Sequence, residues 1–422
     1  MHAHTLSVTR IVRTAAIVGL LSTASAVDLR AAESAGAPNA ISTWSQIAQT
    51  AITPGRSPAS SEYLFALVHA AMYDAVVAIE GRYRPFRVSV KVDQPASPEA
   101  AVASAAYFVL RQRVPVTEPS LTATYVAYLA GLPGGLAKDC GVAVGTEVGA
   151  RWLALRADDR FDNVVTFQPP PAGPGVWEPT AATPPVDVKL AQVRPYVIGV
   201  ADRFRPRGPR RLGGRAYARA FDEVYDVGRV DSLIRTPDQL AVARFWSEHT
   251  AVQWSRNLRN LAAGAQLDLV DTARMLAMVH VASADAVVGC FDAKYHFLFW
   301  RPVHAIQRAD TDDNPLTAPD VTWNALLNVN HPEYPSAHGC FTAAITDTLA
   351  YYFGTDDAEF ALDSTVTGTT RDYARFSEVT EEVQDARVWA GLHFRFSTND
   401  GVTLGRQVAH LVTRRYFRPV ND

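Results

Sequence analysis

The stretch MLAMVHVASADAVVGCFDAK (residues 275–294) aligns without gaps on LFALVHAAMYDAVVAIEGRY (residues 64–83). Each stretch contains a histidine, an aspartate five residues later and then Ala-Val-Val; the pairs are His69 with Asp74 and His280 with Asp285. A shared helical pattern alone would match apolar positions but not a histidine and an aspartate. The alignment therefore predicts a duplicated helical bundle.

Most of the remaining chain has the same helical character. Apolar residues recur at spacings of three and four, and few windows alternate with period two, in the segments 60–79, 97–114, 137–158, 272–300, 341–353 and 403–417. We expect an all-α fold built from two tandem related helical bundles. The His-Asp pairs are expected to be structural, because a histidine on an apolar helix face usually makes one hydrogen bond and stays fixed.

Composition excludes several functional classes. The 422 residues carry 40 Lys and Arg against 43 Asp and Glu, a net charge of −3, so no global field attracts nucleic acid. Arg10 and Arg13 precede an apolar run that is too short to span a bilayer, and Ala24-Ser25-Ala26 is a cleavage pattern. Residues 1–26 are therefore predicted to be a signal peptide, with export to the periplasm or the medium and no membrane span.

The mature chain divides into three predicted parts: a first bundle over 27–166, a connecting segment over 167–230 and a second bundle over 231–422. The connecting segment is rich in proline over 167–198 and basic over 203–215. It is either a plain linker or a loop that covers a site, and its Trp177 argues for packing. Three cysteines are too few for a disulfide framework; we favour buried free thiols over a bridge between Cys290 and Cys340.

Cationic side chains converge in the second bundle. Lys294 lies at the position that matches Tyr83, so chemistry that needs this lysine occurs in one copy only. Lys294 and Arg301 are seven residues apart, close to two helical turns, which would place both on one helix face among aromatic neighbours. Two buried cations need an anion.

A second segment, HPEYPSAHG (331–339), precedes an apolar helical run. Ser336 is a good N-cap, and the first amides after it lack partners within the helix, which favours an oxyanion. Ala337 allows close approach, and His338 lies at the rim, where it can transfer a proton. A third segment carries Arg387 and His393, whose spacing of six requires either a wrapping arginine or a helix end between them.

Together these three segments resemble the signature of vanadium-dependent haloperoxidases and type 2 phosphatidic-acid-phosphatase-like acid phosphatases. The matching residues are Lys294 with Arg301-Pro302, then Pro335-Ser336-Ala337-His338, then Arg387 with His393. The resemblance is close over 294–400 and places the active site in the second bundle. Ala337 replaces a glycine, Ala386 replaces a serine, and Ser397 stands where the family often has an aspartate that orients the catalytic histidine. The orienting partner of His393 is therefore not identified from the sequence.

The resemblance implies roles for these residues. Lys294, Arg301, Ser336, Ala337 and Arg387 would bind vanadate, with phosphate as an alternative occupant of the same site. His393 would be the metal ligand in a haloperoxidase and the phosphorylated nucleophile in a phosphatase. His338 would be the acid–base group, with Glu248 as its candidate acidic partner.

The resemblance favours a haloperoxidase that uses hydrogen peroxide to oxidise halide. His331 matches bromoperoxidases, whereas Phe291 matches chloroperoxidases, so bromide is favoured over chloride on mixed evidence; His331 is alternatively a plain loop histidine. A small organic molecule is an expected acceptor, and apolar helix faces allow a homodimer. The alternatives are a secreted acid phosphatase that acts on phosphate monoesters and a non-catalytic anion-binding protein. A zinc enzyme is not favoured, because the sequence has no Cys/His cluster at ligand spacing.

Overall fold

The computed structural model describes residues 26–30 and 38–420. Of the predicted signal peptide, only Ala26 falls within this part; the rest lies outside the described residues. The described chain is mainly helical, as expected, with one small sheet that the sequence analysis did not predict.

Residues 40–228 contain the helices α1 (Ala40–Ile52), α2 (Pro58–Glu80), α3 (Pro98–Arg113), α4 (Glu118–Ala130), α5 (Leu136–Leu155) and α6 (Arg215–Gly228). The second half contains α7 (Pro237–Phe245), α8 (Thr250–Gly264), α9 (Leu269–Phe297), α10 (Pro302–Gln307), α11 (Ala337–Phe353), α12 (Phe376–Trp389) and α13 (Arg395–Arg415). Short 3-10 turns are η1 (Pro115–Thr117), η2 (Val188–Gln192), η3 (Ala201–Phe204) and η4 (Ala309–Thr311). The sheet consists of β1 (Val27–Asp28), β2 (Asp357–Ser364) and β3 (Thr369–Arg375), with β1 parallel and β3 antiparallel to the central β2.

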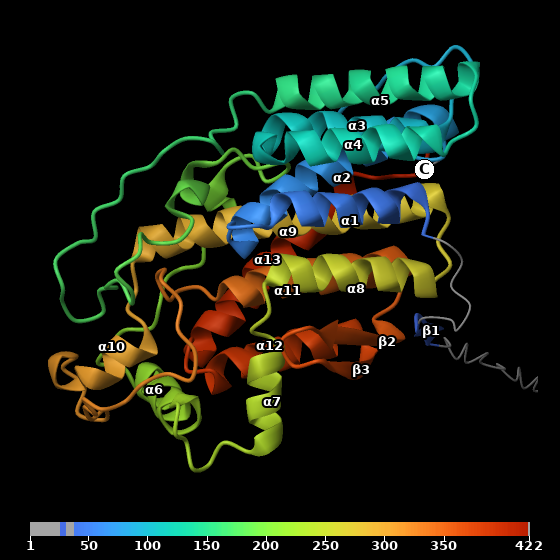
Figure 1. Cartoon of the computed structure of the whole chain (residues 1–422). Helices are drawn as coiled ribbons and strands as arrows, with labels where there is room; N and C mark the ends of the chain where they lie inside the picture. The colour runs from blue at the N-terminus through green and yellow to red at the C-terminus, as the bar shows by residue number, and fades with distance from the viewer. Residues whose placement is uncertain (1–25, 31–37, 421–422) are drawn as a thin grey trace, which may run out of the picture.

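The two helices that carry the repeated sequence, α2 and α9, pack against each other in the middle of the molecule (Figure 1). Helices α3 and α5 cover α2 on one side, and α11 and α13 cover α9 on the other. Both central helices are long and apolar enough to cross a membrane, but 89% and 94% of their apolar windows are buried inside the protein. Such burial is typical of core helices.

The repeated aspartates have the same structural role in both copies. Asp74 accepts hydrogen bonds from three successive backbone amides, those of residues 86–88, at 2.6, 3.2 and 2.9 Å. Asp285 likewise accepts from the amides of residues 196–198, at 2.6, 2.6 and 2.9 Å. Both carboxylates are fully buried. Each therefore fixes the chain segment that crosses its bundle, and the expected structural role of these residues is confirmed.

The repeated histidines also meet in the core. His69 and His280 stack with ring centroids 4.3 Å apart, and His280 Nδ1 lies 2.8 Å from Glu62 Oε1. Burial lowers the pKa of His69 well below its usual value, with the neighbouring His280 as the next cause. These histidines pack at the junction of the two copies.

Close helix packing positions the start of α11 against α13. A Cβ atom at Gly401 would lie 2.6 Å from the carbonyl oxygen of Ser336, and one at Gly405 would lie 2.3 Å from that of Cys340. Real Cβ atoms do not approach backbone oxygen so closely, so glycine is required at both positions. The N-terminus of α11 is thereby held in close backbone contact with α13.

Removal of one aspartate anchor tests the duplicated role. Asp285→Ala leaves three buried amides without an acceptor and is expected to lower the free energy of unfolding by about 3 kcal/mol. Urea denaturation measures this loss. The control is Asp93→Ala, on an exposed aspartate, which should change stability by less than about 0.5 kcal/mol. Equal effects of the two substitutions would contradict the anchor role.

Candidate active site

Lys294 and Arg301 do not share a helix face, so that expectation is wrong. Helix α9 ends at Phe297, and the next residue, Leu298, has a left-handed conformation with φ of 48°. Arg301 instead precedes α10, which begins with Pro302. The two cations meet because the chain turns between them.

The proline-rich segment holds this turn. The amide of Trp177 donates to the carbonyl of Leu298 at 2.7 Å, and the amide of Trp300 donates to the carbonyl of Gly175 at 3.0 Å. Trp177 itself is fully buried, which confirms that this segment packs. A plain linker therefore does not describe residues 175–177, which pack against the turn that leads to Arg301.

Lys294 is completely buried and is held by main-chain oxygens. Its Nζ donates to the carbonyls of Pro332 and Glu333, each at 2.9 Å. An ammonium group has three donors, so one N–H remains free for another partner. Burial lowers the lysine pKa to about 8, and the positive charge of Arg301 acts in the same direction.

Arg301 is fixed by the segment that contains the quoted HPEYPSAHG sequence. Its Nε donates to the His331 carbonyl at 2.9 Å, its Nη2 to His331 Nδ1 at 2.8 Å, and its Nη1 to the Leu392 carbonyl at 2.8 Å. The same Nη1 lies 3.5 Å from Nε2 of His393. Burial lowers the pKa of Arg301 to about 10.

Arg387 reaches the site from the last turn of α12. Its Nη1 donates to the carbonyl of Trp246 at 3.0 Å, whereas its Nε is buried and has no partner among the described residues. Burial lowers its pKa to about 9, with Arg301 as the second cause. The helix ends at Trp389, and Gly391 follows with φ of 73°. Of the two alternatives for the Arg387–His393 spacing, a helix end is the one that occurs.

His393 lies between these cations and a carboxylate. Its Nδ1 is 3.0 Å from Oε1 of Glu333, while its Nε2 is near Arg301 as described above. The side chain is almost completely buried. Burial lowers its pKa well below the usual value, and the charges of Arg301, Lys294 and Arg387 lower it further. The imidazole is therefore neutral, with its Nδ1 proton donated to Glu333.

Glu333 is the site residue that the sequence analysis missed. Besides His393 Nδ1, Oε1 accepts the amide of Phe394 at 3.0 Å, and Oε2 accepts the hydroxyl of Ser397 at 2.6 Å. Burial raises the pKa of Glu333 to about 7, while the Ser397 hydrogen bond and the charges of Arg301 and Lys294 lower it. The available signal was an acidic residue within the quoted stretch, two positions after His331.

The start of α11 contributes the other predicted groups. Ser336 caps the helix and accepts the amide of Gly339 at 3.4 Å, and Ala337 is the first helical residue. Nε2 of His338 lies 3.0 Å from the hydroxyl of Thr250. Burial lowers the pKa of His338 well below its usual value, and Arg387 and Lys294 act in the same direction.

The expected pairing of Glu248 with His338 is wrong. Both carboxylate oxygens of Glu248 bind Arg256, at 2.8 and 2.9 Å, and they also accept two hydrogen bonds from Thr365. Glu248 therefore neutralises an arginine and fixes a turn of the small sheet, while Thr250 is the side-chain partner of His338.

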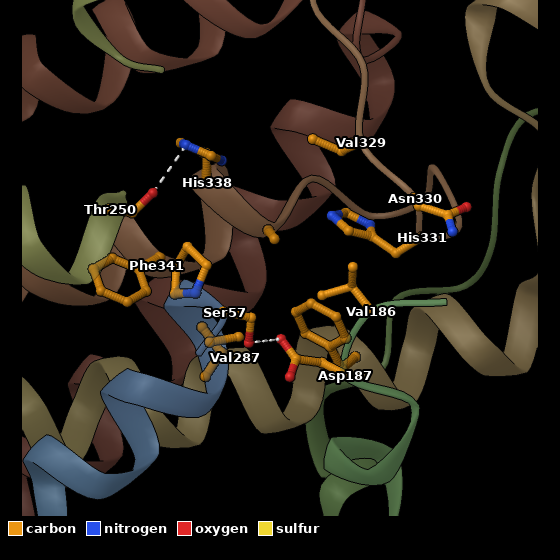
Figure 2. A pocket seen from close by; sticks show the side chains of 14 residues that line it. Ser57, Val186, Asp187, Thr250, Val287, Val329, Asn330, His331, His338 and Phe341 are labelled. Atoms are coloured by element: carbon orange, nitrogen blue, oxygen red, sulfur yellow. Dashed lines mark hydrogen bonds between the residues drawn. The ribbon is translucent and has the colours of Figure 1, made fainter. Parts of the chain in front are cut away.

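A cavity of about 340 Å³ opens between His331 and His338 (Figure 2). Its other walls are mainly apolar side chains, among them Val287, Phe291, Val329 and Phe341. The proline-rich segment contributes Val186 and Asp187, and its Val186 amide donates to the carbonyl of Asn330 at 2.9 Å. The segment thus forms one wall of the cavity.

The predicted thiols are free in the structure. Cys290 and Cys340 are fully buried, and Cys290 Sγ lies 3.7 Å from the carbonyl of Pro335. The favoured prediction of free cysteines is confirmed, and a Cys290–Cys340 bridge is absent from the described structure.

This arrangement fits an oxyanion. The charges of three buried cations act on His393, which contacts the carboxylate of Glu333. The unpartnered Nε of Arg387 and the third N–H of Lys294 can both donate to anionic oxygen. The lone pair of the neutral His393 is on Nε2, whose contact with Arg301 Nη1 is long at 3.5 Å, so it can bind an electrophilic atom. Within residues 26–30 and 38–420, no group of three or more His, Cys, Asp or Glu side chains is arranged to hold a metal ion. The donor set therefore fits a vanadate or phosphate ion that one imidazole contacts.

Known proteins match this chain in sequence and in fold. Residues 274–422 match the family model of the VCPO second helical-bundle domain. Vanadium chloroperoxidase from Curvularia inaequalis is 30% identical over 142 residues, which is 29% of this chain and 23% of that protein. A bacterial vanadium-dependent iodoperoxidase structure superposes with a TM-score of 0.74 at 22% identity, over 91% of this chain and 96% of the other. The holo-type bacterial vanadium-dependent chloroperoxidase gives 0.71 at 16% identity, over 90% and 98%.

The chain has the vanadium haloperoxidase fold. The likeness to solved structures extends over both bundles, whereas the curated relative is matched over about a quarter of its length. The segment 274–422 contains every residue predicted to bind the oxyanion and the three predicted histidines, as well as Glu333. In this haloperoxidase fold, the cations and His393 therefore come from the copy of the bundle that the family model matches.

Phosphate binding and its pH dependence test the buried cation cluster. Phosphate should raise the thermal midpoint at pH 7, because it binds the native state. The rise should shrink between pH 8 and 9.5, since Lys294 loses its proton as the pH passes its pKa of about 8. Orthophosphate is mainly dianionic over this range, so the change reports on the protein.

The control for this measurement is Lys294→Met, for which we expect a smaller rise and a weaker decline between pH 8 and 9.5, because only Arg387, with a pKa of about 9, then titrates in this range. A phosphate-induced rise that stays constant or grows up to pH 9.5 in the unsubstituted protein would contradict the role of Lys294.

Proposed function

We propose that the chain is a vanadium haloperoxidase-like enzyme that oxidises halide with hydrogen peroxide to hypohalous acid at a vanadate bound to His393. The observation that carries this proposal is the group of three buried cations around a neutral imidazole whose Nδ1 contacts Glu333 and whose Nε2 faces Arg301 at 3.5 Å. Vanadate bound there would supply a Lewis acid that activates hydrogen peroxide toward halide.

The residues of the chain have separate tasks in this proposal. Lys294, Arg301 and Arg387 neutralise the oxyanion, with the arginines donating through planar guanidinium groups and the lysine through a point charge. Ser336 and the amide at Ala337 add donors at the start of α11. His393 Nε2 is the protein ligand.

His338 is the proposed acid–base group. It is neutral before hydrogen peroxide enters, because burial lowers its pKa. Its Nε2, which lies 3.0 Å from the Thr250 hydroxyl at the cavity wall, is the atom that would accept a proton from hydrogen peroxide and later return it.

His331 is the proposed halide-side residue. Arg301 Nη2 donates to its Nδ1 at 2.8 Å, so the ring proton is on Nε2, and the side chain lines the cavity. A donor in an apolar cavity favours an anion that sheds water easily, which supports bromide over chloride. Phe291 packs beside His331, with ring centroids 5.4 Å apart. The residue that matches chloroperoxidases and the one that matches bromoperoxidases are therefore neighbours.

An acid phosphatase that acts through a phosphohistidine at His393 is the second candidate. The absence of the family aspartate at Ser397 is an objection to this candidate, because a nucleophilic histidine needs an orienting carboxylate. Glu333 removes this objection, since its carboxylate contacts His393 Nδ1 at 3.0 Å. Assays of both activities on the same protein are therefore needed to distinguish the two candidates.

We also propose export, with residues 1–26 removed as a signal peptide. N-terminal sequencing of the mature protein would test this point. The expected small organic acceptor fits the apolar cavity, and a homodimer remains a prediction.

Addition of orthovanadate to the purified protein should produce peroxide-dependent bromination. His393→Ala should abolish this activity, because no other imidazole replaces the free Nε2, whereas His410→Ala, on the exposed face of α13, should retain it. Hydrolysis of an aryl phosphate is assayed in parallel. The haloperoxidase proposal is refuted if vanadate only inhibits ester hydrolysis, and loss of both activities would favour a non-catalytic anion-binding protein.

A further inference from the structure

We propose that Glu333 is the positioning residue of His393 and takes the place of the aspartate that the family signature has at position 397. The inference rests on the proposed function of the same site. It concerns a carboxylate that comes from the HPEYPSAHG segment rather than from the helix that follows the histidine.

The side chain of Glu333 binds one short stretch of chain at three points. Its oxygens contact His393 Nδ1 at 3.0 Å, the amide of Phe394 at 3.0 Å and the hydroxyl of Ser397 at 2.6 Å. Phe394 is the N-cap of α13 and has no cap from its own side chain. Glu333 therefore fixes the ring and the backbone that carries it.

The main chain of Glu333 also makes hydrogen bonds near Arg301 and to Lys294. Its amide donates to the carbonyl of Phe299 at 3.0 Å, in the turn that leads to Arg301. Its carbonyl accepts Nζ of Lys294 at 2.9 Å. Displacement of Glu333 would thus be transmitted to the lysine and the histidine together.

The contact with Glu333 selects the histidine tautomer. Both Glu333 oxygens accept other hydrogen bonds, from Phe394 and Ser397, which leaves them as acceptors toward His393 and places the histidine proton on Nδ1. The lone pair is then on Nε2, the nitrogen that lies 3.5 Å from Arg301 Nη1. Only this tautomer can bind an oxyanion centre through Nε2, and a partner of this kind typically accounts for a 10–100-fold effect on the affinity of the site.

Ser397 explains why the carboxylate can come from position 333. The serine is fully buried, and its hydroxyl donates to Glu333 Oε2 at 2.6 Å. An aspartate at 397 would place a second carboxylate against the first, and two like charges at this distance repel. We infer that one carboxylate, from either position, is what the site requires.

The experiment compares Glu333→Ala with the double variant Glu333→Ala/Ser397→Asp. Two readouts are used: the ¹⁵N chemical shifts of His393 in the vanadate-free protein, and the dissociation constant of orthovanadate by titration calorimetry. We expect Glu333→Ala to lose the fixed Nδ1-protonated tautomer and to raise the dissociation constant by about 10–100-fold. The double variant should restore the tautomer and recover most of the affinity.

Glu62→Ala is the matched control, because Glu62 is also a buried carboxylate that contacts a histidine, His280, at 2.8 Å. It should lower stability without changing His393. Glu333→Gln keeps the shape of the side chain and serves if the alanine variant does not fold. It should also weaken vanadate binding, because an amide oxygen accepts the Nδ1 proton of His393 more weakly than a carboxylate does.

The inference is overturned if folded Glu333→Ala keeps the same His393 tautomer and binds vanadate as tightly as the unsubstituted protein. It is also overturned if the folded double variant recovers neither readout. Failure of the proposed function would give a different result, because the tautomer measurement needs no vanadate. In that case the unsubstituted protein would not brominate, but Glu333 would still determine the tautomer of His393.

Discussion

The second bundle must hold three positive side chains out of water beside one imidazole. Each buried charge without a partner costs about 3–5 kcal/mol, and Lys294, Arg301 and Arg387 also repel one another. The protein meets this requirement mainly with main-chain carbonyls, at residues 332 and 333 for the lysine, 331 and 392 for Arg301, and 246 for Arg387. Glu333 supplies the single negative charge, and the remaining donors fit an incoming anion.

The duplicated scaffold explains why there is one such site. Both copies keep the buried aspartate that accepts three successive amides, so the two bundles have a common framework. In the first copy, however, Tyr83 stands where the second has Lys294, and its hydroxyl donates to Asp271 at 2.6 Å. That tyrosine joins the two copies at the surface, whereas the lysine faces the core. The first bundle therefore supports the second, and the proline-rich segment forms one wall of the cavity through Val186 and Asp187.

The features that depend on local sequence patterns could be predicted from the sequence. The repeat predicted the paired helices α2 and α9, and the three motif segments contained residues that lie together in the structure. The shared face of Lys294 and Arg301 was wrong, because the left-handed turn at Leu298 is held by bonds to Gly175 and Trp177, more than a hundred residues away in the chain.

Other features depended on contacts that no local pattern contains. The role of Glu333 depends on its contact with His393, which lies sixty residues later in the sequence. The small sheet formed by β2 and β3 was not expected either, because their 357–375 segment is polar and lies among strongly helical neighbours.

The central claim is that these side chains surround one bound oxyanion. A crystal of the protein soaked with orthovanadate, with anomalous data collected at the vanadium absorption edge, tests this most directly. The account predicts one strong peak beside Nε2 of His393, within contact of Lys294, Arg301 and Arg387. A peak at another place in the molecule, or none beside His393 when vanadate is in excess, would contradict it.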